Sequence, residues 1–497
     1  MKGLLDRYRS LPLQVKAALW FLVCTFMQRA VSMITTPVFT RLMTTDEYGR
    51  LGSFYSWHGI LSIVISLFLY YGVHPQGLVK FSERREEFTS SLLGLSTAMV
   101  TFWTVIYLLF RDFWNDIFSL TTTQVLLLMV LIWTASVFNL WANHKRVTYS
   151  YRPLVAVTLI ASLSRPAVEI VFVFYADDKV TARILGWVIA ELAIYSWMMV
   201  YHMSKGKKFF SAYFWKYALI FNLPLVPHYL SQMVLNRADL IMIKKMVGDS
   251  EAGIYNLAYV LAAIFTFFNA ALIQTVSPWM YGKIKEKDYK GFAPICYSTF
   301  IMVAVINLLL ITGAPEIIAI FAPETYSDAV MIVTPVALSV LFQYAYEFFS
   351  LYALYYEKTR TVMVLSTLVA VSNVVLNFLL IPRFGYVAAG YTTLFCYAVF
   401  ALVHYCLMRK ICRDCCGGIY PYDTRIIILI SGLFIAAGFA VSLTYPYPFV
   451  RYGILAAVMV AALIMRRTIV SSIKSLLALR KNSGEVQMSD DNDKINK

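Results

Sequence analysis

The sequence predicts an all-α polytopic membrane protein. Of its 497 residues, 60% are hydrophobic and only 14% are charged, whereas soluble domains carry about 25% charged residues. Apolar runs of about 20 residues, the length that crosses a bilayer as a helix, recur along the whole chain. Short clusters of Lys and Arg separate these runs, as is typical of loops on the inner face of a membrane.

A hydropathy window of about 19 residues predicts about 14 transmembrane helices. They cover residues 15–40, 51–74, 91–110, 124–142, 153–175, 183–203, 217–245, 252–277, 291–312, 328–353, 361–381, 387–408, 425–444 and 452–465. The connections between them are too short for a soluble domain, which typically needs about 50 residues or more.

The simplest partition is two six-helix bundles related by a pseudo-two-fold axis, followed by two further helices. The first bundle covers residues 1–203 and the second covers 217–408, with the basic loop 204–216 between them. The two additional helices lie in 425–465, and the polar tail 481–497 is expected to be a disordered cytoplasmic segment.

The distribution of basic residues predicts the orientation. About 31 of the 43 Lys and Arg residues fall on the side of the N-terminus and about 9 on the other side, which places both termini in the cytoplasm. The apolar run near Ala17 is too long for a cleavable signal peptide, so the first helix is expected to stay as an anchor. The net charge of +15 forms no stripe, so no nucleic-acid partner is expected.

Two arginines within apolar runs are candidate functional residues. Arg29 lies near the middle of the first run, where a guanidinium facing lipid costs at least a few kcal/mol, so we expect it to face protein or a watery cavity. The segment 42–49 lines up with 246–253, about 200 residues later, and Arg237 precedes that second copy. Alternatively, an acidic neighbour neutralises each arginine and the pair only holds helices together.

Prolines inside apolar runs mark candidate hinges, because proline removes a backbone donor and bends a helix. Pro37 lies in the first run, and Pro224 and Pro227 both lie in the seventh. A static kink is the alternative at each position.

Carboxylates within the predicted spans are candidates for coupling or gating. Glu169 lies four residues after Arg165, so the two share a helix face and are expected to pair; otherwise Arg165 lines the cavity. Asp239, Glu191 and Glu347 are of the type that binds protons or sodium ions in transporters, although each could equally be structural.

The remaining polar residues give weaker signals. Cys412, Cys415 and Cys416 form one Cys-x-x-Cys with an extra cysteine, and without a second half this indicates free thiols rather than zinc. His58, His74 and His228 are isolated and are expected to pack. No metal site and no bound cofactor are expected.

Three segments resemble the signature segments of the polysaccharide-exporting oligosaccharide flippases, which belong to the multidrug/oligosaccharidyl-lipid/polysaccharide superfamily. They are residues 39–49 (FTRLMTTDEYG), residues 236–239 (NRAD) leading to 253–255 (GIY), and residues 381–390 (IPRFGYVAAG). Their order and spacing carry the resemblance, which covers roughly residues 10–465.

The resemblance implies a monomeric transporter in the bacterial plasma (inner) membrane. It implies that an undecaprenyl-diphosphate-linked oligosaccharide, such as an O-antigen or lipopolysaccharide repeat unit, moves from the cytoplasmic to the outer leaflet by alternating access, coupled to protons or sodium. A polysaccharide polymerase and chain-length machinery are the implied partners, besides membrane lipid. Arg29, Arg165 and Arg237 would then contact the diphosphate, since arginine forks match phosphate oxygens.

Two alternatives stay open at this point. A multidrug or small-solute antiporter of the same fold would favour an acidic cavity, whereas arginine predominates here. A membrane polymerase or glycosyltransferase would need a substantial outer loop with catalytic carboxylates, and Asp177 and Asp178 lie in a loop of only about seven residues. We therefore expect no catalytic residues and no enzyme activity.

Overall fold

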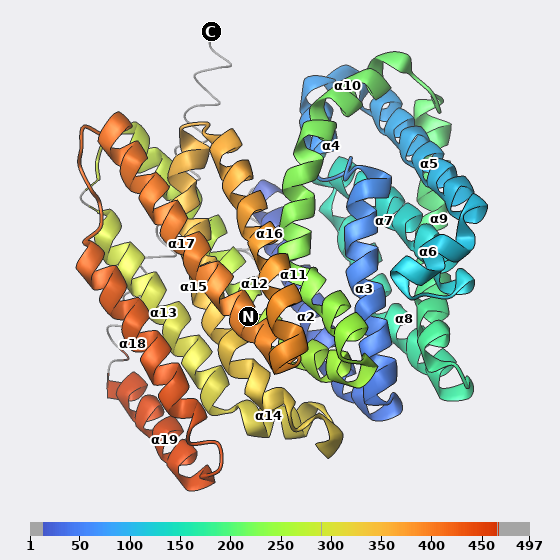
Figure 1. Ribbon diagram of the computed structural model, residues 1–497. Helices are drawn as coiled ribbons and strands as arrows, with labels where there is room; N and C mark the ends of the chain where they lie inside the picture. The colour runs from blue at the N-terminus through green and yellow to red at the C-terminus, as the bar shows by residue number, and fades with distance from the viewer. Residues whose placement is uncertain (1–12, 290, 465, 467–497) are drawn as a thin grey trace, which may run out of the picture. The chain divides into compact units, whose positions relative to one another are not determined.

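The computed structural model describes residues 13–289, 291–464 and 466, and the regular structure within these ranges is helical throughout (Figure 1). The all-α prediction is confirmed. The chain forms two compact units, Met1–Lys244 and Lys245–Lys497. This division falls one long helical segment after the predicted loop 204–216. The partition into two six-helix bundles with two extra helices stays a prediction.

The first unit is built around α9, which packs against α5, α7 and α8, while α2 packs against α8. Its helices are α2 (Leu13–Leu42), α3 (Thr45–Ser66), α4 (Val73–Lys80), α5 (Arg85–Leu109), α6 (Arg111–Phe118), α7 (Thr122–Val147), α8 (Tyr151–Tyr175), α9 (Lys179–Gly206), α10 (Ala212–Asn222) and α11 (Val226–Met246), the last of which crosses the division.

The second unit is built around α15, which lies alongside α12, α13 and α17 (Figure 1). Its helices are α12 (Asp249–Lys285), α13 (Phe292–Thr312), α14 (Ala314–Phe321), α15 (Ala329–Tyr355), α16 (Thr359–Phe384), α17 (Val387–Cys415), α18 (Thr424–Ser442) and α19 (Pro448–Ile464). Most of the apolar stretch of α15 is buried inside the protein, so this helix forms the core of the unit.

Ten helical segments among the described residues are long and apolar enough to cross a membrane, so the chain is a multi-pass membrane protein. The count of fourteen spans stays a prediction. The helices α4, α6 and α14, with eight residues each, are too short to cross and connect longer ones.

The second predicted span is shorter than the hydropathy of residues 51–74 suggests. Its helix α3 ends at Ser66, and Leu67 and Phe68 adopt positive φ angles of 52° and 49° before α4 begins. The buried Asn222 side chain holds this turn: its Oδ1 accepts a hydrogen bond from the Val73 N–H at 3.2 Å, and its Nδ2 donates to the Leu67 carbonyl. A side chain distant in sequence thus satisfies the backbone groups that the broken helix leaves open.

The seventh predicted span is interrupted where its two prolines lie. Helix α10 ends at Asn222, a 3₁₀ turn covers Leu223–Leu225, and α11 begins at Val226. Proline lacks the donor that a continuous helix needs, which explains the break beside Pro224 and Pro227. Pro37, in contrast, lies inside an unbroken α2. The role of all three as moving hinges stays a prediction.

The two segments that line up in the sequence, 42–49 and 246–253, each contain a turn between consecutive helices. In the first segment, Thr44 caps α3: the Glu47 N–H donates to Thr44 Oγ1 at 3.2 Å, and the Thr44 N–H donates to Glu47 Oε2 at 2.8 Å. This reciprocal capping box explains the polar Thr-Thr-Asp-Glu sequence of the segment as a helix start. The second segment joins α11 to α12.

An ion pair attaches the last described helix to the rest of the second unit. Arg451 of α19 is buried and donates to Glu316 of α14. Burial acts to raise the pKa of Glu316, but the Arg451 guanidinium outweighs it, so the pKa lies below its usual value. The carboxylate therefore stays charged and keeps the pair intact near neutral pH.

Asn222 offers a test of how the broken second span is held. We expect Asn222→Ala to lower the free energy of unfolding by about 2–6 kcal/mol, because two buried backbone groups lose their partner and each costs about 1–3 kcal/mol. The measurement is the thermal melting of the purified protein in detergent. Asn139→Ala is the control, since Asn139 Nδ2 bonds only to the Ala135 carbonyl of its own helix; equal melting shifts would contradict this role of Asn222.

Candidate functional site

A buried carboxylate in the first unit holds two arginines. Arg165 Nε donates to Glu169 Oε1 at 2.7 Å, and Arg183 Nε donates to Glu169 Oε2 at 3.1 Å. The Glu169 side chain is only 3% exposed, whereas that of Arg165 is 35% exposed. One carboxylate is thus shared between two guanidiniums, and the partly exposed one is not neutralised by a carboxylate of its own.

The close approach of α8 and α9 makes this sharing feasible. Gly186 faces Glu169 across the contact, and a Cβ at this position would lie 2.9 Å from the Glu169 Cα. Since such a distance is shorter than real contacts allow, a glycine is needed here for the two helices to come together. The contact brings Arg183 of α9 within hydrogen-bonding distance of a carboxylate on α8.

Arg165 also stacks on an aromatic ring. Its guanidinium carbon lies 3.7 Å from the centroid of the Trp187 ring, and the rings of Tyr55 and His58 pack against the same indole at 5.5 Å and 5.1 Å. Stacking on Trp stabilises a guanidinium while leaving its edge available for hydrogen bonds. The arrangement fixes the orientation of Arg165 in the membrane-spanning part of the chain.

A second carboxylate contacts the same tryptophan. Trp187 Nε1 donates to Glu191 Oε1 at 2.7 Å, and Thr134 Oγ1 donates to Glu191 Oε2 at 2.5 Å. Arg165 and Glu191 therefore contact the same indole. If Glu191 carries a proton, the group of Arg165, Glu169, Arg183 and Glu191 has one net positive charge; if it is ionised, the group is neutral.

Arg183 connects this group to the first signature segment. Its guanidinium carbon lies 3.4 Å from the centroid of the Phe39 ring in α2, and the neighbouring Lys179 Nζ donates to the Leu42 carbonyl at 2.7 Å. The sequence reasoning missed Arg183, because no local spacing indicates that residues 169 and 183 pair across a turn. Its position one helical turn after Lys179 at the start of a span was the available signal.

The structure brings together three of the predicted site residues, namely Arg165, Glu169 and Glu191, and the predicted pairing of Arg165 with Glu169 is present. Arg29 lies in the middle of α2 with an exposed side chain. Thr36 and Thr40, two and three turns later on the same helix, are buried. The role of Arg29 in binding a substrate stays a prediction.

The other candidates lie elsewhere. Arg237 is half-buried on α11, and the buried Asp239 accepts a hydrogen bond at Oδ1 from the Leu240 N–H at 3.0 Å. Glu347 belongs to α15 of the second unit and accepts from Gln343 Nε2 at 3.4 Å. The coupling or gating roles of Asp239, Glu169, Glu191 and Glu347 stay predictions.

The cysteines at the end of α17 are free thiols. Cys412 and Cys416 are buried and Cys415 is exposed, and Cys416 Sγ lies 3.4 Å from the Tyr356 hydroxyl. Within residues 13–289, 291–464 and 466, no three or more His, Cys, Asp or Glu side chains are grouped to hold a metal ion.

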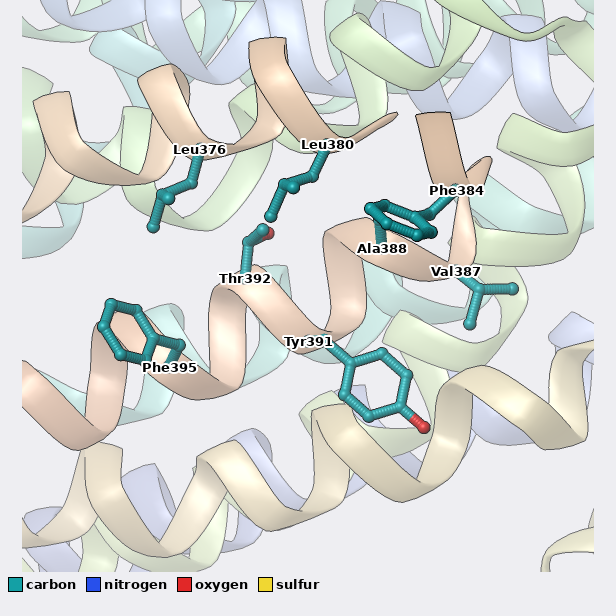
Figure 2. Close-up of a pocket in the computed structure, with 8 residues that line it drawn as sticks. All are labelled: Leu376, Leu380, Phe384, Val387, Ala388, Tyr391, Thr392 and Phe395. Atoms are coloured by element: carbon teal, nitrogen blue, oxygen red, sulfur yellow. The ribbon is translucent and has the colours of Figure 1, made fainter. Parts of the chain in front are cut away.

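A groove of about 560 Å³ lies in the second unit where α16 turns into α17, beside the third signature segment (Figure 2). Its lining is almost entirely apolar: Leu376, Leu380, Phe384, Val387, Ala388, Tyr391, Thr392 and Phe395. With no charged side chain among these residues, the groove suits hydrocarbon and not a diphosphate.

Comparisons with known proteins show the family of the chain and its fold. The model of a family described as "Polysaccharide biosynthesis protein" matches residues 15–282, more than half of the chain. The chain belongs to this family. The match includes the first two signature segments and the whole group around Glu169.

Two relatives come from Haemophilus influenzae. "Lsg locus putative protein 1" is 22% identical over 291 residues, which cover 55% of this chain and 67% of the relative. An "Uncharacterized membrane protein" is 21% identical over 330 residues, covering 63% of this chain and 74% of the relative.

Solved structures share the fold. A structure of lipid II flippase MurJ in an inward closed conformation has a TM-score of 0.68 at 14% identity and covers 91% of this chain and 100% of its own. An inward-facing multidrug resistance MATE transporter of the MOP superfamily has a TM-score of 0.58 at 13% identity, with 80% and 98% covered. The chain shares its fold with these solved structures of a flippase and a transporter, and the family resemblance inferred from the sequence is confirmed.

The shared carboxylate can be tested by substitution. We expect Glu169→Gln to lower the free energy of unfolding by about 3 kcal/mol, because it leaves two guanidiniums side by side in a buried setting without their counter-charge. Thermal melting in detergent measures the loss. Arg183→Gln added to Glu169→Gln should restore part of it; strictly additive losses would show that the two side chains do not interact.

Proposed function

We propose that this protein is a flippase for an undecaprenyl-diphosphate-linked oligosaccharide, a repeat unit of a surface polysaccharide. It moves the lipid from the cytoplasmic to the outer leaflet of a bacterial plasma membrane by alternating access, with both termini in the cytoplasm. The family match and the transporter fold support the general class. The partly exposed Arg165, which shares its carboxylate with Arg183, supports an anionic substrate.

The chemistry of the substrate explains why arginine is needed. A diphosphate head carries about two negative charges and cannot cross hydrocarbon unaided. A guanidinium remains charged at any physiological pH and can donate two parallel hydrogen bonds to phosphate oxygens. Arg165 lies over the Trp187 ring with part of its side chain exposed, so it can donate to a phosphate while still contacting Glu169.

Glu191 provides a route for coupling to a proton gradient. Protonation of Glu191 raises the net charge of the group from zero to one positive charge and favours an anionic head. Loss of the proton restores neutrality and favours release. In this scheme Arg29 and Arg237 line the path of the head, and Asp239, Glu347 and a sodium gradient are the alternative coupling elements.

We propose that the protein works as a monomer in contact with membrane lipid. A polysaccharide polymerase with chain-length machinery receives its product. The competing function is a multidrug or small-solute antiporter of the same fold, such as the MATE transporter whose fold it shares. A cationic drug would favour an acidic site over the arginine-rich group around Glu169.

Transport in proteoliposomes separates these functions. The purified protein is reconstituted with undecaprenyl-diphosphate-linked oligosaccharide, and the appearance of the sugar in the opposite leaflet is followed by its accessibility to an added glycosidase. We expect protein-dependent flipping of this lipid and no uptake of ethidium, a cationic drug. Ethidium transport without lipid flipping would establish the antiporter instead.

Arg165 is the residue on which the proposal makes its sharpest prediction. We expect Arg165→Gln to lower the flipping rate about 10- to 100-fold, since charge-assisted hydrogen bonds contribute about 1.5–3 kcal/mol each. Arg165→Lys should recover only part of the rate, because an ammonium lacks the fork. The control is Arg111→Gln, which removes an exposed arginine paired with Asp112 outside the long helices; equal rates in both variants would remove Arg165 from the site.

A further inference from the structure

Three helices of the first unit meet at a single carboxylate that no part of the proposed transport path uses. His144 Nε2 of α7 lies 3.3 Å from Glu86 Oε1, and His202 Nδ1 of α9 lies 3.3 Å from Glu86 Oε2. The two imidazole rings contact each other with centroids 5.5 Å apart. Glu86 itself comes from the first turn of α5.

These histidines are buried and each has one ring nitrogen without a partner. The His144 and His202 side chains are 8% and 0% exposed. His144 Nδ1 and His202 Nε2 are buried and make no hydrogen bond among the described residues. A third buried histidine, His74 of α4, lies beside this group, with Nε2 at 3.1 Å from Thr89 Oγ1 and Nδ1 again without a partner.

The contacts with Glu86 indicate which ring nitrogens carry hydrogens. An ionised carboxylate only accepts hydrogen bonds, so the nitrogens that face Glu86 must carry the hydrogens. Both neutral imidazoles then present a bare nitrogen, and the group of Glu86, His144 and His202 carries one negative charge. Uptake of one proton makes the group neutral, whereas a second proton would leave a net positive charge in a buried place.

We propose that Glu86, His144 and His202 form a binding site for one proton at the adjoining ends of α5, α7 and α9, and that its occupancy sets the pH dependence of transport. Histidine is the side chain that ordinarily titrates between about pH 5 and pH 8. Under the proposed orientation, these helix ends face the cytoplasm. Proton binding itself does not depend on which substrate the protein carries.

Charged groups next to the site disfavour positive charge on it. Lys145 lies on α7 next to His144, with its Nζ 3.4 Å from the Tyr201 hydroxyl. Arg85 precedes Glu86 and donates from Nε to the Leu78 carbonyl at 2.8 Å. Two cations beside the group oppose any further positive charge. The neighbouring Glu87 is engaged elsewhere, by Arg84 and Lys208.

The site lies at the end of α9, where the chain continues into the interrupted seventh span formed by α10 and α11. A Cβ on Gly206 would lie 2.2 Å from the Glu86 carbonyl oxygen, so the end of α9 is tightly packed against the start of α5. Ser90 Oγ donates to the Lys208 carbonyl at 2.8 Å in the same connection. A change of charge on Glu86 and its histidines therefore acts at the anchor of the segment that leads into α10, the 3₁₀ turn and α11.

Proton uptake by the purified, full-length protein in detergent tests the site. A potentiometric titration from about pH 8 to pH 5 should show about one proton more for the wild type than for His144→Gln/His202→Gln. Glu86→Gln should lose the same proton, because the carboxylate no longer stabilises a charged imidazole. His404→Gln is the matched control: His404 is equally buried with both nitrogens unpartnered among the described residues, but it belongs to the second unit.

Size-exclusion profiles and melting temperatures establish that each variant is folded, and His202→Gln alone replaces the double variant should the latter fail to fold. Uptake by His404→Gln should equal that of the wild type, and the pH profile of transport should flatten in the Glu86 and histidine variants only. The proposal is overturned if Glu86→Gln keeps the full proton uptake, or if the uptake is lost while the pH profile of transport stays as in the wild type. A wild type that binds the proton yet flips no lipid would count against the proposed substrate alone.

Discussion

The cost of placing charge in a medium of low dielectric constant governs the first unit. Arg165 and Arg183 lie on apolar helices, and each would be costly there without a counter-charge. Glu169 offers one oxygen to each, at 2.7 Å and 3.1 Å, so a single carboxylate satisfies two guanidiniums. The contact of α8 with α9, the glycine that permits it and the stacking of Arg183 on Phe39 all follow from this requirement.

Residue composition and periodicity were sufficient for the fold class and for the position of most long helices. Apolar runs of span length leave little choice, because a backbone in hydrocarbon must satisfy its own hydrogen bonds. The pairing of Arg165 with Glu169 was equally accessible, since four residues make one helical turn. The prolines at 224 and 227 also indicated a bend in the seventh span, because their effect is local, although not that the helix breaks into two.

Interactions between residues distant in sequence were beyond this reasoning. Nothing in residues 51–74 shows that the helix stops at Ser66, because the side chain that holds the break, Asn222, lies in another span. Arg183 and the convergence of His144 and His202 on Glu86 have the same origin: each partner looks ordinary in its own segment. Hydropathy predicts which segments are membrane helices, but it does not determine which face of each helix contacts its neighbours.

A shared carboxylate also suits transport better than an isolated arginine would. A carrier must bind its cargo well enough to take it up and weakly enough to release it, so the favourable contacts have to differ between states. A lone buried guanidinium would hold a diphosphate in every state, because nothing else would offset its charge. In the proposed mechanism, Glu169 remains beside Arg165 when the head departs, and Glu191, which accepts from the Trp187 N–H, can add a second negative charge. If the cargo is the proposed diphosphate, the protein thus supplies its own replacement for the phosphate, and release need not leave an uncompensated charge in the membrane.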